Sequence, residues 1–255
     1  MTPWRAWGRR LGWSVLALLA LGVALEAYTR WPSTEQALPV VVAPGARELV
    51  LIVHGSFGRE EPALLALERR FRELAAARPD VQVVRYAWSP ASDNILRAGP
   101  RGVHIGSQLG TRLAAAPQLV RLHLVAHSAG AYLLDPLCEA WRAARRAGRG
   151  PPVAATDGPG GASAGQVEMT FLDPIGLRGM FERGWGAREF GRCADVAEAF
   201  INTDDAAPAT DRPLRHARTI DVTAARAAAG DRGDGHRWPI EYYRARLSAL
   251  AVPLH

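Results

Sequence analysis

The chain has 255 residues, enough for one α/β domain with a full core, and its 48% hydrophobic and 22% charged residues place it among ordinary globular proteins. The net charge is +6, and all 31 basic residues are arginine. These arginines are spread along the chain, and the one dense group, Arg142, Arg145, Arg146 and Arg149, falls at the end of an expected helix, where cations are favourable. The composition therefore gives no reason to expect a nucleic-acid partner.

Residues 1–30 have the pattern of a signal peptide or signal anchor. Three arginines within the first ten residues precede an uncharged apolar run over residues 11–25. The run is short for a membrane span, which takes about 20 residues, but the cleavage site that could follow Ala24 is weak. We expect an uncleaved anchor in preference to a cleaved signal peptide. The basic N-terminal end predicts that the rest of the chain is exported, as a membrane-anchored or secreted domain in the periplasm or outside the cell.

The rest of the chain reads as a Pro-rich linker over residues 31–46 and one α/β domain over residues 47–255. Strands are expected at residues 48–54, 81–88, 119–126, 167–172, 196–203 and 218–223, and helices at 63–77, 101–116, 129–146 and after 236. Continuous apolar strands separated by amphipathic helices predict a mostly parallel sheet with helices on both faces. Residues 148–165 lack periodicity and are expected to form a surface loop, and residues 173–191 to be poor in helix.

The segment LHLVAHSAGAYL, residues 122–133, predicts a buried strand, a sharp turn that presents Ser128, and the start of a helix. A serine at such a turn sits in strained backbone, so the residues two before and two after it must be small. Ala126 and Gly130 occupy those positions. The N–H groups at the start of the helix would stabilise negative charge on a tetrahedral intermediate, and the Ala129 N–H is the natural first donor. Ser128 is therefore the candidate nucleophile.

A serine hydroxyl needs a base, and the base needs an orienting carboxylate. His216 and His236 are the two histidines that follow Ser128 and precede the chain end at His255. His236 lies in a polar loop between the last expected strand and the last helix, where such a base is needed. We therefore predict that His236 is the base.

Two positions offer the carboxylate. Asp173 directly follows the apolar strand VEMTFL and is the preferred acid, while Asp204 and Asp205 follow the next strand and are the alternatives. Each could instead cap a turn. The second oxyanion donor is expected in the turn after the first strand, in the phrase HGSFG, where the Ser56 N–H is the best candidate.

Four blocks of sequence resemble α/β-hydrolases of the lipase and esterase type, with a pancreatic-lipase-like pattern: LVLIVHGSF, LHLVAHSAGAYL, FLDPIG and GHRWPIEYY. The resemblance implies a single α/β-hydrolase domain. In that family the HG strand supplies an oxyanion donor, LDP the acid, and a His followed by paired Tyr the base, which implies Ser128, Asp173 and His236. Ala126 replaces the first glycine of the turn, and we expect neither the family's disulfide framework nor its C-terminal lipid-binding domain. These departures favour ester hydrolysis over lipase activity proper.

The expected function is a monomeric serine hydrolase that cleaves carboxylic or lipid esters through an acyl-enzyme on Ser128, attached to the membrane by its N-terminal segment. An amidase or thioesterase would use the same triad, and a membrane-tethered binding protein could keep the fold without turnover. No cofactor is expected, and no C-x-x-C or H-E-x-x-H spacing suggests a metal.

Two further questions stay open at the level of sequence. Cys138 and Cys193 could form the disulfide that an exported chain permits, or Cys138 could be a small buried hydrophobe. A lid over the site could come from residues 89–102 or from residues 178–191.

Overall fold

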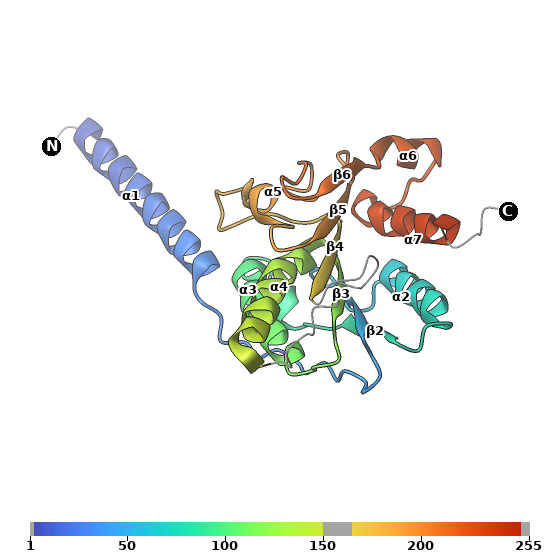
Figure 1. Cartoon of the computed structure of the whole chain (residues 1–255). Helices are drawn as coiled ribbons and strands as arrows, with labels where there is room; N and C mark the ends of the chain where they lie inside the picture. The colour runs from blue at the N-terminus through green and yellow to red at the C-terminus, as the bar shows by residue number, and fades with distance from the viewer. Residues whose placement is uncertain (1–2, 150–164, 251–255) are drawn as a thin grey trace.

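The computed structural model describes residues 3–149 and 165–250. At its centre is a parallel sheet of six strands in the order β2-β1-β3-β4-β5-β6 (Figure 1). The strands are β1 (Glu48–Val53), β2 (Val81–Tyr86), β3 (Arg121–His127), β4 (Gln166–Leu172), β5 (Val196–Ile201) and β6 (Arg218–Asp221). All five neighbouring pairs are parallel, which confirms the predicted α/β fold.

Helices cover both faces of the sheet. The helices in the described residues are α1 (Pro3–Arg30), α2 (Pro62–Ala75), α3 (Ala98–Leu113), α4 (Leu134–Ala144), α5 (Trp185–Glu189), α6 (Thr223–Ala228) and α7 (Trp238–Leu250). Shorter helical turns are η1 (Ala91–Asp93), η2 (Ser128–Leu133), η3 (Arg145–Arg149) and η4 (Gly235–Arg237). Helices α3 and α4 pack together on one face, and α2 and α7 on the other (Figure 1). The helix expected from residue 129 starts as the 3₁₀ turn η2, and α6 was not expected.

Strand β1 shows why the sequence is apolar without alternation. Successive side chains of a strand point to opposite faces. Leu49, Leu51 and Val53 join the core under α3 and α4, whereas Val50 and Ile52 join the core under α2 and α7. Because both faces are covered, every position of the strand from Leu49 to Val53 is buried in apolar surroundings.

The order of the strands defines the place where a site can form. From β1 the chain first moves outward to β2, and from β3 it moves the other way to β4, β5 and β6. In open parallel sheets, ligands bind outside the carboxyl ends of the strands at such a switch point. Gly55 and Ser128 lie just beyond the carboxyl ends of β1 and β3, on either side of this point.

Residues 31–46, expected to be a linker, run over the surface of the domain and are held by hydrogen bonds. Ala37 N donates to Gln108 Oε1 of α3 at 3.0 Å, and Gln82 Nε2 of β2 donates to the carbonyl oxygen of Val41 at 2.8 Å. The segment thus connects α1 to the body of the protein through fixed contacts. Most of the expected surface loop, residues 150–164, lies outside the described residues.

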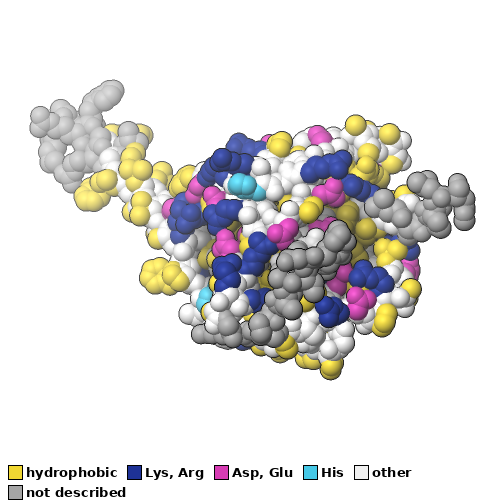
Figure 2. Space-filling model, viewed as in Figure 1, with side chains coloured by type: hydrophobic (Ala, Val, Ile, Leu, Met, Phe, Trp, Pro, Cys, Tyr) yellow, Lys and Arg dark blue, Asp and Glu magenta, His cyan; other side chains and the backbone are white. Residues whose placement is uncertain are grey.

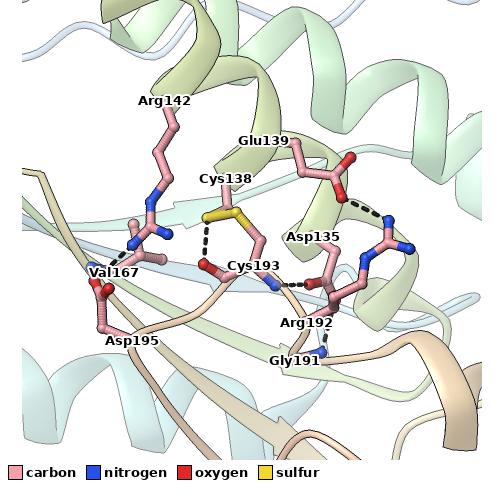
Figure 3. Close-up of a disulfide and its surroundings, with 9 residues drawn as sticks. All are labelled: Asp135, Cys138, Glu139, Arg142, Val167, Gly191, Arg192, Cys193 and Asp195. Carbon is pink, nitrogen blue, oxygen red and sulfur yellow. Dashed lines mark hydrogen bonds and ion pairs between the residues drawn. A yellow bond between two sulfur atoms is a disulfide. The ribbon is translucent and has the colours of Figure 1, made fainter. Parts of the chain in front are cut away.

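Cys138 of α4 and Cys193, 55 residues further along the chain, form a disulfide (Figure 3). The carboxylate of Asp135 supports the same junction, because it accepts hydrogen bonds from the backbone N–H groups of Gly191 and Cys193, both at 2.8 Å. Two ion pairs flank the bridge: Arg142 with Asp195, and Arg192 with Glu139. The disulfide ties the helix after Ser128 to the segment that leads into β5.

Helix α1 projects away from the body of the protein (Figure 1). The segment Gly12–Arg30 is long and apolar enough to cross a membrane, and it is almost entirely exposed. An apolar N-terminal helix of this kind suits a signal or an anchor. Together with the disulfide, it fits a protein outside the cytoplasm.

Candidate active site

Ser128 occupies the turn between β3 and η2 with a left-handed backbone. Its φ is +56°, and its side chain is buried at 5% relative exposure. A non-glycine residue with positive φ is uncommon, and such strain gathers at functional sites. The sharp, strained turn that the sequence predicted at this residue is present.

Two glycines allow the end of β1 to approach this turn closely. A Cβ added to Gly55 would lie 2.6 Å from the Cβ of Ser128, and one added to Gly130 would lie 2.8 Å from the carbonyl oxygens of Val53 and His54. Neither contact is tolerable for a real side chain. Ser56, which follows Gly55, is therefore held beside the turn of Ser128.

A hydrogen bond of 2.6 Å joins His236 Nδ1 to Asp173 Oδ2. Asp173 directly follows β4, is fully buried, and also accepts the backbone N–H of Asn202 at 2.9 Å through Oδ1. His236 lies in η4, immediately before α7. Because the carboxylate accepts the Nδ1 proton, the other ring nitrogen, Nε2, is left to act as a base.

His127 connects the loop of His236 to the turn of Ser128. The ring of His127 lies 4.6 Å from that of His236, centroid to centroid, and its Nε2 is 2.9 Å from the carbonyl oxygen of His236. A carbonyl can only accept, so Nε2 carries the proton. Burial lowers the pKa of His127 to about 3, which keeps the ring neutral. The sequence placed His127 in the turn and gave no sign of this second contact.

A second carboxylate faces His236. Asp205 Oδ2 lies 3.5 Å from His236 Nδ1, and its side chain is 3% exposed. Asp204 instead pairs with Arg226 at 3.0 Å and has a side chain that is 51% exposed. Of the acids expected from the sequence, the structure brings Asp173 and Asp205 to His236, and it directs Asp204 elsewhere.

The three groups shift one another's proton affinity. Burial raises the pKa of Asp173 above its usual range, with a further rise from its hydrogen bond to Asp205, while His236 opposes the shift. Burial would also raise the pKa of Asp205, but hydrogen bonds with His236 and Asp173 lower it below its usual range. Burial would lower the pKa of His236, but the two carboxylates outweigh this effect and raise it to about 9. The two acids therefore favour the protonated form of His236, and the ring must lose a proton before its Nε2 can act as a base.

One imidazole and two carboxylates could also ligate a metal ion. The ligand atoms of Asp173, Asp205 and His236 all lie within 4.8 Å of one another. The separation of 2.6 Å between Asp173 and His236 is that of a charge-assisted hydrogen bond, and ligands of one ion stand further apart. The arrangement of these atoms is that of hydrogen-bonded partners.

A cavity of about 1120 Å³ lies at this edge of the sheet. Its lining includes Ser56 and Ala129, the two expected oxyanion donors, and Ile175, whose N–H donates to the carbonyl oxygen of Ser128 at 3.2 Å. Tyr132 and Trp185, whose rings stack 5.9 Å apart, add an aromatic wall. Both segments expected as lids also contribute to the lining.

Comparison with known protein families and with curated protein sequences finds no match in either case. The case for a function therefore rests on the site itself. There, a strained serine stands beside the glycine turn of a neighbouring strand, and a paired histidine and carboxylate come to the same edge of the sheet from more distant parts of the chain.

Proposed function

We propose that the protein is a serine hydrolase of the α/β-hydrolase superfamily that cleaves carboxylic esters through an acyl-enzyme on Ser128. The observation that carries the proposal is the hydrogen bond between Asp173 and His236, two residues 63 positions apart, at the sheet edge where Ser128 stands in its strained turn. A buried carboxylate, an imidazole and a serine are the groups that acyl transfer requires.

In the proposed reaction, Nε2 of His236 removes the proton of the Ser128 hydroxyl, and the serine oxygen attacks the acyl carbon. Asp173 holds the Nδ1 proton and stabilises the imidazolium. His236 then returns its proton to the leaving alcohol, and the acyl group remains on Ser128. Water, activated by the same histidine, releases the acid and restores the serine.

The oxyanion that forms in both steps needs fixed donors. We assign this role to the backbone N–H groups of Ser56 and Ala129, which both belong to residues that line the cavity. The close approach of Gly55 to Ser128 supports the assignment, because Ser56 and Ala129 are the residues that follow these two in the chain. Each such donor contributes roughly 3 kcal/mol to transition-state binding in related chemistry.

The membership in the superfamily is supported by the order of the groups along the chain. Ser128 follows β3, the carboxylates follow β4 and β5, and His236 precedes the last helix, an order typical of α/β-hydrolases. The lining of the cavity contains five arginines and two glutamates, but its aromatic and aliphatic side chains favour an ester with an apolar part. We propose further that α1 anchors this domain in a membrane, with the domain outside the cytoplasm.

Hydrolysis of a short-chain nitrophenyl ester tests the proposal. Ser128→Ala should reduce turnover to the background rate without changing the circular dichroism spectrum. Ser107→Ala is the matched control, since it removes a hydroxyl from the lining of the same cavity, away from the proposed machinery. Turnover that survives in Ser128→Ala would refute the assignment of the nucleophile.

A further inference from the structure

The last turns of α1 are part of the wall of the cavity. Thr29 and Arg30 line the cavity, together with Pro32 and Ser33 just after the helix. Thr29 is also buried, at 3% exposure, although most of α1 is exposed. The helix therefore ends in fixed contact with the site and does not act as a loose tether.

Two loops, which we call the rim, hold the end of α1: residues 94–97 and residues 178–183. In the first loop, Asn94 Nδ2 donates to the hydroxyl of Tyr28 at 3.0 Å, and the guanidinium of Arg97 lies 5.2 Å from the centre of the same ring. In the second, the backbone N–H of Met180 donates to Glu26 at 2.7 Å. Both loops thus meet the helix within its last five residues.

Between these contacts, the rim exposes large apolar side chains. Ile95 and Phe181 are 67% and 75% exposed, and Leu96 and Met180 are 39% and 37% exposed. Arg178 and Arg183 are exposed in the same region and form no ion pair with any residue in the described ranges. Apolar side chains beside free cations suit a surface of lipid headgroups with negative charge. Figure 2 shows hydrophobic side chains along α1 and charged side chains where it meets the body of the protein.

The length of α1 places the rim at the depth of a membrane surface. A helix rises 1.5 Å per residue, so a hydrocarbon core of about 30 Å takes about 20 residues. A helix that leaves the cytoplasmic headgroups after its last N-terminal arginine, Arg10, reaches the opposite surface near residue 30. Tyr28 and Trp31, which are 43% and 65% exposed, stand at this level, where aromatic residues are favoured.

We propose that the rim rests in the headgroup layer of the membrane that α1 spans, so that the cavity opens at the lipid surface. The inference depends on the proposed anchor role of α1, but it does not depend on chemistry at Ser128. The docked surface consists of Ile95, Leu96, Met180 and Phe181 with the neighbouring arginines. An amphiphilic substrate would then reach the cavity without leaving the membrane.

Fluorescence quenching in vesicles that contain anionic lipid tests the proposal on the full-length chain. Both native cysteines are bridged, so a fluorophore attaches only to an introduced cysteine. The positions are Ile95→Cys and Phe181→Cys in the rim, Leu18→Cys in α1 as a test of insertion, and Ala228→Cys in α6 as an exposed control. The quencher is a lipid spin-labelled near the headgroup for the rim and control positions, and one labelled deep in the acyl chain for position 18.

We expect the shallow quencher to reduce the fluorescence at positions 95 and 181 several-fold more than at position 228, with position 18 quenched by the deep label. Rim labels quenched no more than position 228, while position 18 is quenched, would show that the domain stands clear of the membrane and overturn the docking. An unquenched label at position 18 would overturn the anchor on which docking depends. Neither result depends on ester hydrolysis, so failure of membrane docking can be distinguished from failure of the proposed reaction at Ser128.

Discussion

The second carboxylate beside His236 leads to a prediction about pH dependence. His236 must be neutral to accept the serine proton, so kcat/KM rises as the pH passes its pKa. Because Asp173 and Asp205 raise that pKa to about 9, we expect activity to increase into the alkaline range. Asp205→Asn removes one of the two negative charges that stabilise the imidazolium. The pKa of His236 should therefore fall, and the rising limb should move to lower pH.

The distance between Asp205 and His236 sets the size of the shift. At 3.5 Å, a unit charge pair is worth about 1.2 kcal/mol in a water-like medium and about four times more at the effective dielectric constant of a protein surface. One pKa unit corresponds to about 1.4 kcal/mol. Loss of Asp205 also favours ionisation of Asp173, which retains part of the stabilisation. We therefore use the smaller, water-like value of the charge–charge energy and expect a downward shift of about one pH unit.

The assay is kcat/KM for a nitrophenyl ester between about pH 5 and about pH 10, a range that spans the usual and the raised pKa of a histidine. Asparagine keeps an oxygen that can accept the hydrogen bonds that Asp205 Oδ1 receives from Ala207 and Thr210, so the loop should persist. Asp204→Asn is the matched control, since Asp204 follows the same strand but pairs with Arg226. An unmoved limb in Asp205→Asn, or an equal shift in Asp204→Asn, would refute the reasoning.

Two predictions concern the framework around the site. Gly55→Ala should destabilise the protein by about 1–3 kcal/mol and reduce turnover, because the added Cβ would overlap that of Ser128. Gly45→Ala is the control and should do neither, since no atom lies within 4 Å of its added Cβ. Equal melting temperatures for the two variants would contradict this prediction. Replacing Cys138 and Cys193 by serine should lower the unfolding free energy by roughly 4 kcal/mol, because the bridge closes a loop of 55 residues. Urea denaturation measures the change. An unchanged midpoint of unfolding would contradict the role of the bridge as a stabilising element.

The sequence was a sufficient guide to the sheet because strands buried on both faces carry an unbroken apolar signal. All six strands end within two residues of the expected position, and β1 illustrates the cause, since alternate side chains enter two different cores. Helix α6 was missed because Thr223–Ala228 is short, rich in alanine and without buried residues, so it has no apolar period. The sequence did not predict that residues 31–46 are fixed to the domain either, because the contacts that hold them are made by backbone groups and glutamine side chains.

In the candidate site, the sequence could propose groups but could not decide between them. From the sequence, Asp173 and Asp205 are alternatives, whereas in the structure parallel strands end at one edge of the sheet and so bring both to the same imidazole. Their local patterns are similar, and only the packing shows that Asp204 turns toward Arg226. No sequence pattern predicts the disulfide, because two cysteines 55 residues apart come together only through the folding of the sheet and its helices.

The most direct test of the account is covalent labelling of the purified protein with a fluorophosphonate, followed by intact mass and peptide mapping. Only a serine with an adjacent base reacts readily with such a probe. We expect one adduct, on the peptide that contains Ser128, in the wild-type protein and in Ser107→Ala, and none in Ser128→Ala. An unmodified wild-type protein, or an adduct that persists in Ser128→Ala, would contradict the central claim that Ser128 is an activated nucleophile.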